Sequence, residues 1–181
     1  MRLFFAVELS PELVGWVRSA TERLKPLGQN LRWTLPEKAH LTLSFLGELP
    51  DSRLPALREA ARAAAAGRSP FGLAFGGLGA FDSWKKVKVV WAGVAEGAAS
   101  LEGLAEALRR ELDSRSVPLE KRDFAAHLTL ARARTPGAQP KLASASLPPA
   151  PRLAVESLSL MLSRMGEAGT RYEALERFRL E

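Results

Sequence analysis

The sequence predicts an α+β protein made of two similar lobes, each combining β-sheet with covering helices. Short apolar segments of strand length alternate along the chain with three longer amphipathic segments of helix length. The tetrapeptide His-Leu-Thr-Leu occurs twice, at residues 40–43 and 127–130. In each half of the chain a helical segment and a polar stretch precede the tetrapeptide, and this echo predicts that the two lobes resemble each other.

The first elements have clear local signals. Residues 2–9 are a short apolar run before a turn, which is typical of a strand. Residues 10–24 follow as a helix, with Ser10 as the N-cap and Pro11 at the first helical position. The apolar face of this helix is formed by Leu13, Trp16 and Val17. Residues 31–35 and 40–46 alternate in polarity and are therefore predicted to be strands.

The middle and the end of the chain continue the mixture of helices and strands. Residues 51–66 predict a second helix, capped by Asp51 or Ser52. Strands are then expected at 71–81 and 87–94, a helix at 100–114, a strand at 127–133, a surface connection with one helical turn at 135–151, and a closing hairpin of 152–165 and 170–180. We expect residues 1–181 to form a single bilobal domain.

Composition limits the classes of function. The chain has 181 residues, of which 46% are hydrophobic and 25% charged, as in ordinary globular proteins. Its formal net charge of +6 favours an anionic partner such as nucleic acid or phosphate. The absence of cysteine excludes disulfides and thiolate chemistry and fits the cytoplasm. No apolar run approaches the ~20 residues needed to cross a bilayer, and Glu8 interrupts the apolar start, so we expect neither a membrane span nor a signal peptide.

The repeated tetrapeptide uses both histidines of the chain. Because alternate side chains of a strand point to opposite faces, His40 and Thr42 share one face, and His127 and Thr129 share one face of the second copy. The leucines of each copy point the other way and can be buried. If the two strands lie side by side, their polar faces form a cleft floored by two imidazoles and two hydroxyls.

Such a cleft suits attack on a phosphodiester. A neutral imidazole can accept a proton from the nucleophile and a protonated one can donate to the leaving oxygen, each step typically contributing about 10²–10⁴ in rate. The ordinary histidine pKa of roughly 6.5 suits both tasks. The threonine hydroxyls can donate hydrogen bonds to the non-bridging phosphate oxygens.

Other interpretations of these motifs remain. A single copy is most simply a partly buried histidine beside a hydroxyl, but two identical copies argue against that interpretation. Metal binding lacks ligands, because no cysteine is present and no carboxylate lies at ligand spacing from either histidine. We therefore predict no metal and no cofactor. The glycine-rich residues 76–81 predict a turn between strands, and the basic residues of 83–88 and 120–124 a solvated surface that could also contact RNA.

The paired tetrapeptides and the residues around them resemble those of a known family. Paired His-x-Thr-x motifs are the signature of the 2H phosphoesterases, and the chain is most similar to their RNA 2′,3′-cyclic phosphodiesterase branch, also described as 2′-5′ RNA ligases. The resemblance rests on LRWTLPEKAHLTLSFLGEL and FAAHLTLAR, with support from RLFFAVEL, VKVVWAGV and LMLSRMGEAGTRYEAL. It implies antiparallel sheets with covering helices around a central cleft.

The resemblance also implies roles for individual residues. It makes His40 the proton donor and His127 the proton acceptor, and it places Thr42 and Thr129 at the phosphate. It further implies substrate contacts from two residues that follow the motifs, Phe45 near the nucleobase and Arg132 near the phosphate.

Alternation alone argues against cleft positions for these last two residues. Both Phe45 and Arg132 have the parity of the leucines in their strands, opposite to the histidines. On that basis Phe45 is a core residue unless a bend near Gly47 turns it, and Arg132 is a solvated arginine at a strand end.

The sequence therefore predicts a metal-independent, monomeric cytoplasmic enzyme. It would hydrolyse RNA 2′,3′-cyclic phosphate ends, for example those of tRNA fragments, to 2′-phosphates, and with an RNA 5′-hydroxyl as nucleophile it would catalyse 2′-5′ ligation. Two alternatives remain open. One is a non-catalytic module that binds RNA ends, and the other is a 2H phosphodiesterase that acts on a small cyclic nucleotide.

Overall fold

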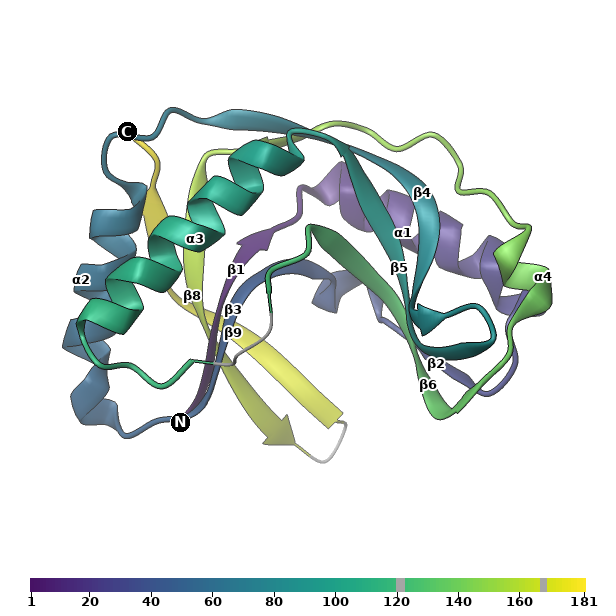
Figure 1. Ribbon diagram of the computed structural model, residues 1–181, viewed down its shortest axis with the longest axis horizontal. Helices are drawn as coiled ribbons and strands as arrows, with labels where there is room; N and C mark the ends of the chain where they lie inside the picture. Colours follow the sequence, from purple (N-terminus) through teal and green to yellow (C-terminus); the bar gives the residue numbers. More distant parts are fainter. Residues whose placement is uncertain (120–122, 167–168) are drawn as a thin grey trace.

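The computed structural model describes residues 1–119, 123–166 and 169–181, which form two antiparallel sheets flanked by helices (Figure 1). The four-stranded sheet has the order β3-β1-β8-β9, with bounds His40–Glu48, Arg2–Glu8, Ser157–Gly166 and Gly169–Arg179. The five-stranded sheet has the order β2-β6-β5-β4-β7, with bounds Leu31–Trp33, His127–Gly137, Lys86–Glu96, Phe71–Ser83 and Leu153–Val155. This α+β architecture confirms the predicted fold class.

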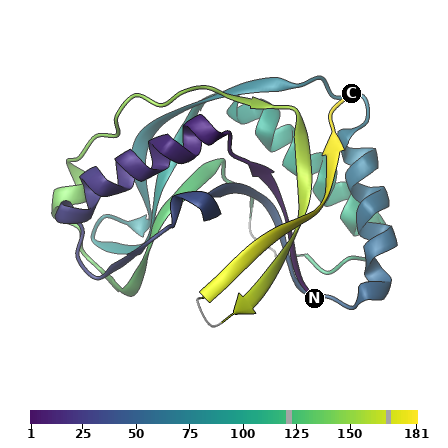
Figure 2. The ribbon, with the colours of Figure 1, turned by 180° about the vertical axis from the view of Figure 1, so that it is seen from behind.

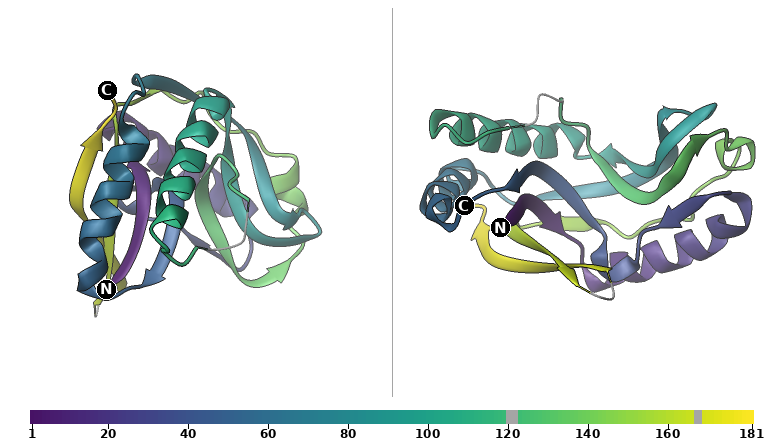
Figure 3. Two further views of the ribbon diagram at one scale, coloured as in Figure 1. Left: turned by 60° about the vertical axis from the view of Figure 1, so that its left-hand side comes forward. Right: turned by 90° about the horizontal axis from the view of Figure 1, so that it is seen from below.

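Two of the helices, α1 and α3, follow a strand of one sheet in the chain but pack against the other sheet. The helix bounds are Pro11–Leu24 for α1, Leu54–Ala65 for α2, Ala98–Ser114 for α3 and Pro140–Ala143 for α4, with 3₁₀ turns at Lys25–Leu27, Pro36–Lys38 and Asp51–Arg53. Helices α2 and α3 pack together against the four-stranded sheet, although α3 follows β5 of the other sheet. Helix α1 follows β1 but packs on the five-stranded sheet (Figure 3), where Trp16 stacks on Phe75 with ring centroids 6.0 Å apart.

We name the two halves by these layers. The first lobe is the four-stranded sheet with α2 and α3, and the second lobe is the five-stranded sheet with α1 and α4. The view from behind shows the hairpin of β8 and β9 projecting from the first lobe, beyond the start of β1, where Arg2 pairs with Ser163 (Figure 2). Each lobe therefore combines one antiparallel sheet with covering helices, as predicted.

The start of α1 follows its local sequence, whereas the start of α2 does not. Ser10 caps α1, with its hydroxyl accepting a hydrogen bond from the backbone N–H of Leu13 at 3.4 Å, and Pro11 is the first helical residue. The predicted cap of the second helix is wrong: Asp51 begins a 3₁₀ turn, and α2 starts at Leu54 after Arg53 without a side-chain cap. The tight turn satisfies the early backbone groups in place of a capping side chain.

The closing segment differs from the prediction in one respect. Residues 152–165 were expected to form one strand, but the segment divides at Glu156. Strand β7 pairs with β4 in the second lobe, and β8 pairs with β1 and β9 in the first lobe. The apolar pattern is continuous across Glu156, so the division arises from pairing with distant strands. The hairpin of β8 and β9 confirms the predicted closing hairpin, and its residues 167–168 lie outside the described part of the chain.

One cluster of buried apolar side chains extends through both lobes. It contains Leu3 and Phe5 of the first sheet, Val90 and Leu128 of the second, and Leu104 of α3, all fully buried. The two sheets are thus joined by a shared core. No helix in the described ranges is long and apolar enough to span a membrane.

Candidate active site

His40 is the first residue of β3 and its ring is held in one orientation. Its Nδ1–H donates a hydrogen bond of 2.9 Å to the carbonyl oxygen of Lys38, two residues earlier. Because a carbonyl only accepts, Nδ1 carries the proton and Nε2 is left to react. The ring centroid lies 4.9 Å from that of Phe4 and 5.2 Å from that of Tyr172, whose ring is nearly perpendicular to the imidazole.

His127 opens β6 in the same manner. Its Nδ1–H donates to the carbonyl oxygen of Ala125 at 2.7 Å, again two residues earlier, so that Nε2 is again the remaining nitrogen. Its ring meets Phe81 edge-on at 5.0 Å and lies 6.4 Å from Trp91. Both imidazoles are therefore fixed in the same tautomer against a pair of aromatic rings.

The alternation predicted for the two tetrapeptides is confirmed. Leu41, Leu43, Leu128 and Leu130 are buried, with at most 6% of any side chain exposed. Thr42 shares a face with His40, and Thr129 shares a face with His127, opposite to the leucines of each strand. Both threonines are partly exposed. Each strand thus presents an imidazole and a hydroxyl away from the core.

The prediction for Phe45 from alternation is wrong, because β3 contains bulges. Ala6 of β1 pairs with Thr42, but Phe4 pairs with Phe45, so Leu43 is an extra residue on the β3 side. Directly paired residues point to the same side of a sheet. Phe45 therefore lies on the face of Thr42 and His40, where it packs beside Phe4 under the guanidinium of Arg2, 5.2 Å from the ring centroid.

The prediction from alternation that Arg132 points with the leucines is also wrong, because β6 contains an equivalent bulge. Trp91 of β5 pairs with Thr129, whereas Val90 pairs with Ala131, which leaves Leu130 as the extra residue. Both Leu130 and Ala131 are buried, and the parity of the strand changes after them. Arg132 consequently shares the face of His127 and Thr129.

Arg132 acts on both histidines. Burial lowers the pKa of His40, and the positive charge of Arg132 lowers the pKa further, against the hydrogen bond to Lys38. The pKa of His127 is lowered by burial and by Arg132 in the same way, against the hydrogen bond to Ala125. Arg132 is therefore within electrostatic range of both rings, although they belong to different sheets, and strands β3 and β6 approach one another between the lobes. In the free protein both imidazoles are neutral at neutral pH.

Trp91 forms much of the surface beside His127. Its indole lies over Gly79 of β4, where the Cβ atom of any other residue would overlap the ring, so that a side chain there would collide with it. Phe81 and Trp91 lie with ring centroids 5.3 Å apart. The buried Nε1 of Trp91 has no hydrogen-bond partner among the described residues.

Sequence reasoning missed the aromatic residues that hold the two histidines. Phe4 and Tyr172 surround His40, and Phe81 and Trp91 surround His127. Their apolar character was visible in the sequence, but alternation within one strand does not indicate which strands are neighbours. Only the sheet order identifies these partners.

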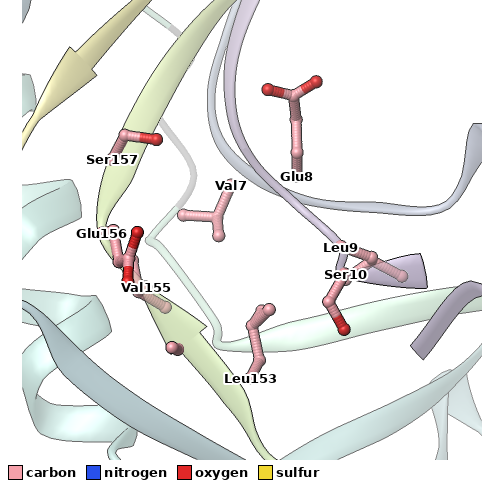
Figure 4. Close-up of a pocket in the computed structure, with 9 residues that line it drawn as sticks. Val7, Glu8, Leu9, Ser10, Leu153, Val155, Glu156 and Ser157 are labelled. Atoms are coloured by element: carbon pink, nitrogen blue, oxygen red, sulfur yellow. The ribbon is translucent and has the colours of Figure 1, made fainter. Parts of the chain in front are cut away.

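Two other features are separate from the histidines. A pocket of about 200 Å³ lies where β1 ends beside β7 and β8, lined by Val7, Glu8, Leu153 and Ser157 among others (Figure 4), and none of the six predicted site residues lines it. The residues described contain no group of three or more His, Cys, Asp or Glu side chains placed to hold a metal ion. Lys121 and Arg122, considered as RNA contacts, lie outside the described residues.

Comparison with known proteins gives consistent relatives. The chain is 30% identical to the RNA 2′,3′-cyclic phosphodiesterase of Methanothermobacter thermautotrophicus, with 99% of each chain covered. It is 31% identical to the protein of the same name from Thermus thermophilus, covering 99% of this chain and 90% of the relative.

Solved structures agree over the whole chain. A crystal structure of a Thermus thermophilus protein superposes with a TM-score of 0.80 at 30% identity, covering 99% of this chain and 98% of the other. Escherichia coli LigT complexed with NADP+ gives a TM-score of 0.79 at 28% identity, covering 99% and 96%. A family model described as the 2′-5′ RNA ligase superfamily matches residues 10–167. Together with the paired motifs and the two-sheet fold, this match confirms the resemblance seen in the sequence, and the chain belongs to the 2′-5′ RNA ligase superfamily.

Proposed function

We propose that this protein is an RNA 2′,3′-cyclic phosphodiesterase that opens the cyclic phosphate at an RNA end and leaves a 2′-phosphate without a metal ion. The observation that supports this most directly is the matched pair of imidazoles. Each has Nδ1–H bonded to a backbone carbonyl, and both lie within electrostatic range of Arg132. The curated relatives carry the same activity in their names.

In the proposed reaction, water attacks the phosphorus in line with the bond to the ribose 3′ oxygen. Nε2 of His127 accepts the proton of the water as the new P–O bond forms. The P–O3′ bond breaks, and Nε2 of protonated His40 gives its proton to the 3′ oxygen. The products are a 3′-hydroxyl and a 2′-phosphate, and the two histidines have exchanged protonation states.

The remaining site residues bind the phosphate and the base in this proposal. Thr42 and Thr129 donate hydrogen bonds to the non-bridging oxygens, and Arg132 neutralises their charge. The bound anion also favours the imidazolium form, which raises the pKa of His40 above its value in the free protein. Phe45 offers an aromatic face to the terminal nucleobase.

The same chemistry with an RNA 5′-hydroxyl in place of water gives 2′-5′ ligation, which we include in the proposal. We also propose that residues 1–181 act as a single domain, because one buried cluster contains side chains of both sheets. A monomeric state, a cytoplasmic location and tRNA-derived substrates stay predictions from the sequence.

The test is incubation with an oligoribonucleotide that ends in a 2′,3′-cyclic phosphate, followed by mapping of the product phosphate. We expect a 2′-phosphate, with turnover unchanged in excess chelator. Binding without turnover would instead support the RNA-end-binding module. Turnover of nucleoside cyclic phosphates alone would support the small-nucleotide alternative, and activity lost in chelator and restored by zinc or magnesium would contradict the metal-free mechanism.

A further inference from the structure

The face of the second lobe that carries His127 and Thr129 continues past Arg132 into a pocket lined by arginines. Arg32, Arg132 and Arg134, with Ala133, line a cavity of about 230 Å³. Arg32 of β2 pairs directly with Arg132 of β6, so the two side chains leave the sheet on the same side. Arg134 is two residues further along β6 and shares that side, about 7 Å away along the strand.

These three cations lack the neutralising partners found elsewhere on the molecule. Other arginines form ion pairs, for example Arg177 with Glu8, Arg62 with Glu176 and Arg152 with Glu96. Within the described ranges no carboxylate forms an ion pair with Arg32, Arg132 or Arg134, and all three side chains are exposed.

Placing like charges opposite each other in a sheet is destabilising. Arg32 and Arg132 are in that position, and Arg134 adds a third positive charge to the same side. An anion in the pocket would relieve this repulsion, and guanidinium groups bind phosphate through paired, charge-assisted hydrogen bonds. Since Arg132 already belongs to the proposed active site, the pocket is the continuation of that site along β6 and β2.

We propose that Arg32 and Arg134 form a second phosphate subsite, which binds the phosphodiester on the 5′ side of the terminal nucleotide. This inference rests on the proposed function, because it takes the cyclic phosphate to lie between the histidines and Arg132. It specifies the substrate class: the protein prefers the end of an oligonucleotide over a free nucleoside cyclic phosphate. Arg132 lies between the two phosphates and contributes to both subsites.

The test compares the turnover of three substrates by the unsubstituted protein. They are a nucleoside 2′,3′-cyclic phosphate, a dinucleotide ending in the same cyclic phosphate, and that dinucleotide with its phosphodiester replaced by an uncharged methylphosphonate. We expect kcat/KM to be about tenfold higher for the phosphodiester dinucleotide than for the methylphosphonate, as two exposed ion pairs would give. The difference should lie in KM, because the second phosphate does not react.

The double variant Arg32→Gln/Arg134→Gln should lose this preference and keep its kcat/KM on the methylphosphonate dinucleotide and the mononucleotide. The matched control is Arg18→Gln/Arg23→Gln, two exposed arginines on α1, which covers the opposite face of the same lobe. It removes the same charge and should keep the full preference.

The outcomes separate the subsite from the reaction. If the unsubstituted protein hydrolyses all three substrates but treats the two dinucleotides alike, the subsite is absent and the proposed function stands. Equal loss on all three substrates in the Arg32→Gln/Arg134→Gln variant would also overturn the subsite. If no substrate is hydrolysed by the unsubstituted protein, the proposed function itself fails.

Discussion

Strands β3 and β6 share the same local structure around the tetrapeptide, but the residues that follow it and the neighbouring strands differ between the two lobes. Each begins with a histidine whose Nδ1–H bonds the carbonyl two residues earlier. Each has a bulge after its threonine that brings the residue five positions after the histidine onto the histidine's face. That residue is Phe45 in the first lobe and Arg132 in the second. The same bulge therefore places an aromatic ring beside the histidine in the first lobe and a cation beside the histidine in the second lobe.

Two copies of one tetrapeptide can serve a reaction in which one histidine accepts a proton and the other donates one, because the surroundings of the two rings differ. The backbone hydrogen bonds and bulges are common to both strands, so both imidazoles are oriented alike. The residues that follow the tetrapeptide differ, and so do the strands beside it: Phe4 and Tyr172 surround one ring, Phe81 and Trp91 the other. In the proposed reaction each lobe therefore supplies one proton-transfer group, and the second lobe adds the cation of Arg132.

The largest expected effect tests whether the two histidines are equivalent in importance. His40→Ala and His127→Ala should each lower kcat on a cyclic-phosphate oligonucleotide by about 10²–10⁴. The double variant should lose much less than the product of the two, because the rings act as one unit. RNA affinity, measured separately, should survive in all three. Near-normal turnover in either single variant would refute the paired mechanism and favour the RNA-end-binding module.

Substitution of Arg132 tests the charge of the second lobe. Arg132→Gln should lower kcat/KM by about 10–10², the loss of one charge-assisted hydrogen bond. It should also raise the pKa of both histidines, because the cation that disfavours their protonated forms is gone. The pH profile of kcat/KM would then move to higher pH. Arg132→Lys is the matched control, since it keeps the charge and should keep the profile; an unmoved profile in Arg132→Gln would show that Arg132 does not act on the imidazoles.

The unsubstituted protein provides a second pH measurement. The profile of kcat/KM reports the free protein, where both histidines have a pKa below the ordinary 6.5, so its maximum should lie below pH 6.5. The profile of kcat reports the complex, in which the phosphate anion raises these values, and its maximum should lie at higher pH. Coincident maxima would mean that the bound phosphate does not interact with the imidazoles.

The aromatic surface of the second lobe depends on a glycine, which gives a test on stability. Gly79→Ala should lower the free energy of unfolding by about 1–3 kcal/mol, because its methyl group collides with the indole of Trp91. Thermal unfolding would measure the change. Gly15→Ala is the control: apart from its chain neighbours and the backbone of its own helix, no described atom lies within 4 Å of the added methyl group, and alanine inside a helix should stabilise by about 0.5–1 kcal/mol. Equal stability of the two variants would contradict the close packing of Trp91 on β4.

The smallest expected effect concerns Phe45, the counterpart of Arg132. Phe45→Leu keeps an apolar side chain beside Phe4 but removes the aromatic face. If the ring stacks on the terminal base, KM should rise by roughly three- to tenfold with kcat little changed, at the lower end of the energies measured for such stacking. An unchanged KM would show that Phe45 only packs within the first lobe. Of the two residues that the bulges reposition, only Arg132 would then contact the substrate.

Much of the site could be predicted because it depends on local chemistry. The alternation of the tetrapeptides was sufficient to bury Leu41 and Leu128 and to place the two histidines on the other faces, where they are partly buried. The cap of α1 at Ser10 was also predicted correctly, since an N-cap hydroxyl bonds to a backbone N–H within the same turn. The cap of α2 was not, because a 3₁₀ turn replaced it.

The sequence by itself determined the repeated motif, the order of most elements and the family. Only the tertiary structure decided which face Phe45 and Arg132 occupy, since a bulge is set by the hydrogen-bond register with β1 and β5 and leaves no mark on the alternation of one strand. The division of residues 152–165 between two sheets has the same origin, as does the meeting of Arg32 with Arg132, which are 100 residues apart. Strand pairing is a long-range choice among backbones with identical donors and acceptors, so it is resolved by packing of the whole chain.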